Sequence, residues 1–66
     1  MYPRLRDLRE DAEMNQTQVA KYLGMSQTGY SKYETGENDI PTQVLIKLAA
    51  LYRVSVDYLL GISDKK

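Results

Sequence analysis

Apolar side chains recur at helical spacing from the start of the chain. Leu5, Leu8 and Ala12 fall three and four residues apart, which places them on one face of a helix. Pro3 suits the first position of such a helix, because the N–H that proline lacks would have no partner there. The pattern predicts a first helix over residues 3–12.

A second short helix is predicted directly afterwards. Asn15 offers a side-chain cap and Gln18 follows three residues later, which is a variant of the capping box. Gly24 ends the helix, since glycine adopts the left-handed conformation at no steric cost. The apolar stripe between these signals consists of Val19, Ala20 and Leu23.

The third helix begins almost at once, with Ser26 as its cap and Gly36 at its end. Tyr30 and Tyr33 lie one turn apart on a shared face. Only three residues separate this helix from the second, so the two must cross at a steep angle. Ala20, one turn before the glycine corner, is the small residue that such a close crossing needs.

Two further helices complete the pattern. Thr42 is predicted to cap the fourth, with Pro41 fixing its entry, and Ser55 to cap a last short helix over residues 56–60 that ends at Gly61. The wide apolar stripe of the fourth helix consists of Val44, Leu45, Leu48, Ala49, Leu51 and Tyr52. Residues 62–66 are expected to form a frayed tail. No segment alternates with period two, so we expect a single all-helical domain over residues 1–66.

Composition excludes several classes of protein. The chain has no cysteine and no histidine, so disulfides and thiolate or imidazole zinc sites are excluded. No apolar run approaches the roughly 20 residues that span a bilayer, and the charged N-terminal segment does not resemble a signal peptide. We therefore expect a cytoplasmic protein without metal or cofactor. So small a chain with no phosphate-binding loop is not expected to be an enzyme.

Charge first argues against nucleic-acid binding and then, by its distribution, for it. Nine basic residues balance nine acidic ones, whereas nucleic-acid binders usually carry a basic excess. Yet no acidic residue lies between Met14 and Tyr33, a stretch that includes Lys21 and Lys32. This stretch would present a face that a phosphate backbone can approach.

Residues 15–26, NQTQVAKYLGMS, resemble the second helix and turn of the phage-repressor family, the Cro and lambda-repressor-like proteins also called XRE. Residues 31–36, SKYETG, followed by Pro41 and Thr42, match the third helix of that family and the start of its fourth. Leu48 and Ala49 with residues 54–61 match its C-terminal pattern. The resemblance runs from about residue 5 to residue 61. It implies a lambda-repressor-like DNA-binding bundle of five short helices, with the helix-turn-helix at the second and third.

The resemblance also implies where DNA would bind. The third helix would enter the major groove by its N-terminal end. Glutamine there can pair with adenine, lysine with guanine, and a threonine methyl group with thymine. The predicted base contacts are Gln27, Thr28, Ser31 and Lys32. The predicted backbone contacts are Asn15, Gln16, Lys21, Tyr30 and Thr42, because helix N-termini attract phosphate. Arg9 matches a family arginine that pairs with the glutamate ending the third helix, here Glu34.

Two positions allow more than one interpretation. Tyr30 is either a core residue or, because a buried tyrosine needs a partner for its hydroxyl, a side chain that reaches the DNA backbone. Gly29 costs about 1 kcal/mol relative to alanine inside a helix. It permits a close approach to DNA, leaves room for a flanking side chain, or is simply tolerated.

The family implies a small transcriptional regulator, in the first place a repressor, that reads a two-fold symmetric operator in double-stranded DNA. A weak homodimer is expected through the C-terminal apolar residues Val56, Tyr58, Leu59 and Ile62. No small-molecule effector is implied, since there is no sensor domain. The alternative is a protein-binding module on the same fold, an antitoxin or adaptor. The turn Glu37-Asn38-Asp39 favours it, because many family members carry basic residues there.

Overall fold

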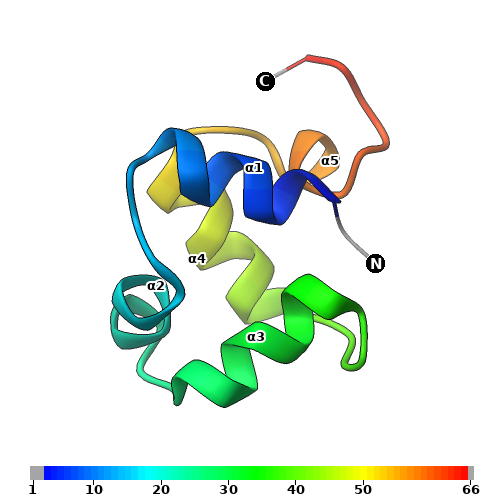
Figure 1. The fold of residues 1–66 in the computed structure, drawn as a ribbon. Helices are drawn as coiled ribbons and strands as arrows, with labels where there is room; N and C mark the ends of the chain where they lie inside the picture. The colour runs from blue at the N-terminus through cyan, green and yellow to red at the C-terminus, as the bar shows by residue number, and fades with distance from the viewer. Residues whose placement is uncertain (1–2, 66) are drawn as a thin grey trace.

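The computed structural model describes residues 3–65 and consists of helices and turns (Figure 1). The helices are α1 (Pro3–Asp11), α2 (Gln16–Leu23), α3 (Gln27–Thr35), α4 (Thr42–Tyr52) and α5 (Val56–Leu59). Residues 3–65 contain no strand. The prediction of an all-helical bundle with five short helices is confirmed.

Side-chain caps start three of the helices as the sequence predicts. The Asn15 side chain accepts the Gln18 amide at 2.8 Å and the Gln18 side chain accepts the Asn15 amide at 2.8 Å, a complete capping box at α2. Ser26 caps α3, and Ser55 caps α5. These bonds satisfy amides that would otherwise have no intrahelical partner.

Helix α4 begins differently from the prediction. Thr42 is its first helical residue and not its cap, so that prediction is wrong. The carbonyl of Pro41 accepts the amides of both Val44 and Leu45 at 3.0 Å, and no side chain caps the helix. Pro41 has a ψ of 150°, which is not helical, so it is the last residue before the helix. The helix therefore begins at Thr42.

Two helix ends differ from the sequence prediction by a single residue, and two agree with it. Helix α1 stops at Asp11, so Ala12 lies beyond its apolar face and is exposed, contrary to expectation. Helix α5 stops at Leu59 instead of residue 60. Gly24 and Gly36 end α2 and α3 as predicted, and both are left-handed, with φ of 73° and 85°.

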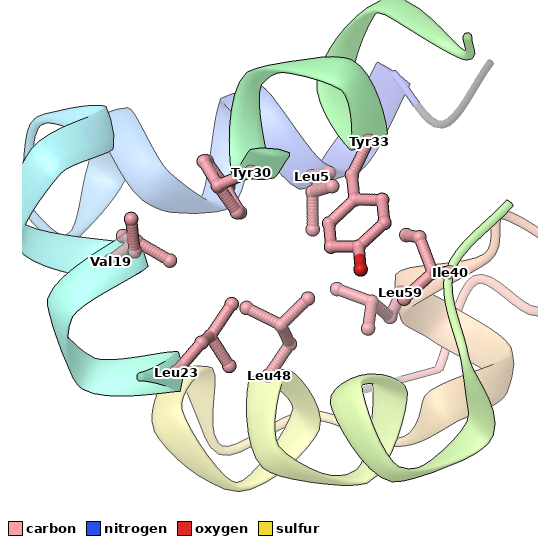
Figure 2. Close-up of a cluster of buried hydrophobic side chains, with 9 residues drawn as sticks. Leu5, Val19, Leu23, Tyr30, Tyr33, Ile40, Leu48 and Leu59 are labelled. Carbon is pink, nitrogen blue, oxygen red and sulfur yellow. The ribbon is translucent and has the colours of Figure 1, made fainter. Parts of the chain in front are cut away.

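All five helices contribute to one core (Figure 2). The core consists of Leu5, Val19, Ala20, Leu23, Tyr30, Tyr33, Ile40, Leu48 and Leu59. Ala20 is only 2% exposed, as expected of the small residue at the crossing of α2 and α3. The apolar stripe of α4 faces this core, with Leu48 and Ala49 buried and Val44, Leu45, Leu51 and Tyr52 partly buried.

Arg4 joins the start of α1 to the C-terminal segment. Its guanidinium donates to the carbonyls of Tyr58 and Ser63 at 3.0 and 2.6 Å, pairs with Asp64 at 2.9 Å, and stacks 4.3 Å from the centre of the Tyr58 ring. These contacts hold Ser63 and Asp64 against the bundle, in a segment predicted to fray. Lys66, the end of that segment, lies outside the described residues.

Candidate nucleic-acid interface

The first turns of α3 present polar side chains to solvent. Gln27, Thr28 and Lys32 are exposed, and Ser31 is partly buried. None of the four is covered by the core that α3 forms on its other face, where Tyr30 and Tyr33 lie. The four predicted base-contact residues therefore share the outward side of α3, as the proposed readout requires.

Gln27 is held in place by a chain of side-chain hydrogen bonds. Its Nε2 donates to Oε1 of Gln16 at 2.5 Å, and Nε2 of Gln16 donates to Oε1 of Glu34 at 3.1 Å. The bonds run from the exposed first turn of α3, through the start of α2, to a buried carboxylate at the end of α3. Their effect is to restrict the rotamers of Gln27 before any ligand binds, which lowers the entropy cost of binding.

Glu34 is anchored in turn by Arg9. Nε and Nη2 of Arg9 donate to the two carboxylate oxygens at 2.6 and 3.2 Å, and Nη1 donates to the Met14 carbonyl at 3.0 Å. The side chains are 12% and 5% exposed, so this bidentate pair is nearly buried. The predicted Arg9–Glu34 ion pair between α1 and α3 is confirmed.

The partners of Glu34 lower its pKa by more than its burial raises it. Burial alone would raise the pKa of Glu34, but hydrogen bonds from Arg9 and Gln16, together with the nearby Tyr30 hydroxyl, lower it below its ordinary value. Glu34 also raises the pKa of Arg9. Both groups are therefore charged at neutral pH, and the chain of bonds that holds Gln27 stays intact there.

Tyr30 is a core residue. It is 0% exposed, and its ring packs edge-on against Tyr33 with centroids 6.3 Å apart. The predicted contact of Tyr30 with the DNA backbone is wrong, because the side chain points into the bundle. The hydroxyls of Tyr30 and Tyr52 are both buried without a good hydrogen bond within residues 3–65. Burial and the nearby Glu34 carboxylate raise the pKa of Tyr30, so it stays neutral.

The other predicted backbone contacts lie at helix ends. Gln16 begins α2 and Thr42 begins α4, where the first amides have no intrahelical carbonyl to bind. The amide and side chain of Asn15 are already used in the capping box, which leaves its Nδ2 free to donate. Lys21 is exposed in the last turn of α2. Contacts of these four residues with a phosphate backbone remain predictions.

Gly29 leaves room for a neighbouring side chain. A Cβ at this position would lie 3.1 Å from Cε of Met25 and 3.2 Å from Oγ of Ser26. Ser26 accepts the Gly29 amide as the cap of α3, so it cannot move without loss. Of the three interpretations that the sequence left open for Gly29, the structure supports room for a flanking side chain, here Met25.

The predicted dimer residues separate into two groups. Leu59 is 1% exposed and belongs to the core, so its assignment to an interface is wrong. Ile62 is 73% exposed, and Val56 is partly buried. Tyr58 is partly buried beneath the Arg4 guanidinium. The apolar edge at the C-terminal end is thus smaller than the sequence indicated.

No helix among residues 3–65 is both long enough and apolar enough to cross a membrane. Nor does this part of the chain gather three or more potential metal-ligating side chains.

Comparison with known proteins gives consistent results. A family model described as helix-turn-helix matches residues 5–59. The chain is 41% identical over 61 residues to the uncharacterized HTH-type transcriptional regulator YobD of Bacillus subtilis, covering 92% of this chain and 54% of that protein. It is 38% identical over 58 residues to the cryptic phage CTXphi transcriptional repressor RstR of Vibrio cholerae, covering 88% and 52%. The chain spans about half the length of these curated relatives.

Two solved structures share the fold. The P22 c2 repressor, crystallised with a synthetic operator, superposes with a TM-score of 0.81 at 28% identity, covering 91% of both chains. A transcriptional regulator from Listeria innocua superposes with a TM-score of 0.83 at 26% identity, covering 94% of this chain and 58% of that one. The arrangement of α1 to α5 is therefore lambda-repressor-like.

Proposed function

The chain belongs to the helix-turn-helix family of the phage-repressor type, and from this premise we propose that it is a small transcriptional regulator that binds double-stranded DNA sequence-specifically. In this proposal α3 enters the major groove by its N-terminal end. The regulator acts in the cytoplasm, most simply as a repressor, and has no catalytic role. Support comes from relatives named as regulators and repressors and from the operator-bound P22 c2 repressor.

One observation carries the proposal. Gln27 stands exposed at the first turn of α3 and is already fixed through Gln16 and Glu34 in a bonded chain. A glutamine in this state can present its amide to the N6/N7 edge of adenine without first losing rotamer freedom. Thr28 and Lys32 lie within the same two turns and extend the reading surface. Phosphates would then meet the open amides at the starts of α2 and α4.

We propose further that two copies bind one operator through the C-terminal edge formed by Val56, Tyr58 and Ile62. One short helix reads only a few base pairs, so a two-fold pair with half-sites about one helical turn apart adds specificity. Because this edge exposes only a small apolar area, we expect the two copies to associate weakly in solution and to form a stable pair only on DNA. Sedimentation at increasing concentration, with and without operator, tests this proposal. A monomer mass on DNA would contradict it.

Selection of bound duplexes from random sequence tests the regulator proposal. The expected outcome is a short consensus with an adenine at the position read by Gln27, repeated as an inverted repeat. Repeating the selection with Gln27→Ala should relax the preference at that position and leave the other positions unchanged. Recovery of sequences with no common motif would overturn sequence-specific binding.

A further inference from the structure

A groove of about 290 Å³ opens between the C-terminal ends of α1 and α4. Its apolar part is formed by Leu8, Leu51 and Val54, each of which is partly buried. Asp11 and Arg53 also line it and are exposed. None of these residues belongs to the proposed DNA-reading surface.

Arg53 occupies a backbone conformation in which glycine would be less strained. It follows α4 with φ 57° and ψ 45°, in the left-handed region. The equivalent positions after α2 and α3 are Gly24 and Gly36, whereas Glu13 takes the same conformation after α1, with φ 58°. Replacing Arg53 by glycine would therefore remove the guanidinium without disturbing the end of α4.

The charges of the groove are available to a ligand. Arg53 and Asp11 form no ion pair with any residue in the described part of the chain. The groove thus offers an apolar floor flanked by one cation and one anion. Ala12, Asp11 and Arg53 are exposed, so the groove is too open to enclose a free small molecule, whose surface is usually 70–90% buried.

The groove also lies away from the DNA-reading helix. In Figure 1 the ends of α1 and α4 meet at the upper left, whereas α3 runs along the bottom of the bundle. A molecule in the groove would therefore leave the outward side of α3 uncovered, and the chain could hold DNA and this second molecule together.

We propose that this groove is a docking site for a segment of a partner protein that carries an apolar side chain between a basic and an acidic residue. The apolar side chain would contact Leu51 and Val54, the base would face Asp11 and the acid would face Arg53. This second interaction goes beyond DNA binding, and it gives the regulator a surface through which another protein can act on it.

Blocked peptides of sequence Lys-Ala-Leu-Ala-Glu and Glu-Ala-Leu-Ala-Lys, which cover both orders of charge, are suitable probes. Titrated into the ¹⁵N-labelled chain, one of them should shift the amide signals of Leu8, Leu51 and Val54. Matched peptides with serine for leucine, or with two like charges, should bind more weakly. Absence of groove shifts with both probes would overturn the proposal.

Arg53→Gly supplies the matched variant, because glycine suits this backbone and the fold is retained. It should weaken the peptide by about two- to five-fold, the effect of one exposed ion pair, and leave operator affinity unchanged. Lys47→Ala, which removes an exposed cation elsewhere on α4, should change neither. An equal loss in both variants would show non-specific attraction. Concentration-dependent groove shifts without peptide would show that a second copy is the occupant. Either result would overturn the proposal.

Discussion

Glu34 is the residue on which the candidate interface depends. It takes hydrogen bonds from α1 through Arg9 and from α2 through Gln16, while it belongs to α3. A nearly buried carboxylate is costly to desolvate, and its partners offset that cost only while all of them are present. Glu34 therefore couples the orientation of three helices to the side chain of Gln27.

Removing the guanidinium should expose this dependence. We expect Arg9→Met to lower the free energy of unfolding by about 3–5 kcal/mol, because it leaves the buried Glu34 charge without a counter-ion. Arg6→Met is the matched control. Its ion pair with Glu10 is exposed on α1, so its loss should cost only about 0.3–0.5 kcal/mol. Urea unfolding of both variants provides the measurement, and equal losses would contradict the role given to Glu34.

The same pair predicts how stability depends on pH. The pKa of Glu34 is lower in the folded chain than its ordinary value of 4.5. A group of this kind stabilises the fold above its unfolded pKa, and the stabilisation is lost as the pH falls through the folded pKa. The free energy of unfolding should thus decline below about pH 4.5, and Glu34→Gln should decline less steeply. A steeper acid loss in Glu34→Gln would contradict this account.

At the scale of elements, caps and glycine stops place the helices. Asn15 with Gln18 and Ser26 could be identified from sequence because a cap involves residues only three apart. Thr42 misled the prediction because threonine next to proline offers the same local signal, whereas the Pro41 carbonyl begins the helix. Local sequence therefore defines the helices to within a residue or two but does not identify every cap.

The contrast between the two positions can be measured. Asn15→Ala should lower the free energy of unfolding by about 1 kcal/mol, since it opens the capping box of α2. Thr42→Ala should change it by less than about 0.5 kcal/mol, because the Thr42 side chain makes no cap bond. Thermal unfolding of the two variants under one buffer condition tests this prediction. A larger loss for Thr42→Ala would show that the helix start is wrongly placed.

Apart from the close crossing of α2 and α3 at Ala20, contacts between elements were accessible to sequence reasoning only where the family resemblance supplied them. It supplied Arg9–Glu34, which lies 25 residues apart in sequence. The bridge from Gln16 to Gln27 and Glu34, and the contacts of Arg4, depend on how helices pack, and no local pattern indicates them. Burial was misjudged for the same reason at Leu59, an apolar residue whose direction is decided by the neighbouring helices.

At the scale of the whole molecule, net charge and function are reconciled by where the charges lie. The chain is neutral, and its carboxylates leave residues 14–33 free, which include α2 and most of α3. The only basic side chains in that stretch are Lys21 and Lys32, and both are exposed. DNA affinity should therefore come more from helix N-termini and base contacts than from a dense basic surface.

This distribution predicts a shallow dependence of DNA binding on salt. The slope of log K against log salt should correspond to about two to four released counterions per subunit, where six or more would indicate a basic surface. Glu37 and Asp39, exposed after α3, add repulsion instead of phosphate contacts. Fluorescence anisotropy with a selected duplex at several salt concentrations gives the slope. A steep one would contradict the proposed balance of contacts.

The central claim is that the outward side of α3 reads DNA, and the double variant Gln27→Ala/Lys32→Ala tests it most directly. Two lost base contacts of about 1–3 kcal/mol each should weaken operator binding by roughly 30-fold or more, with circular dichroism unchanged. Lys47→Ala, an exposed change on α4, should bind as the parent does. Undiminished operator binding by the folded double variant would contradict the assignment.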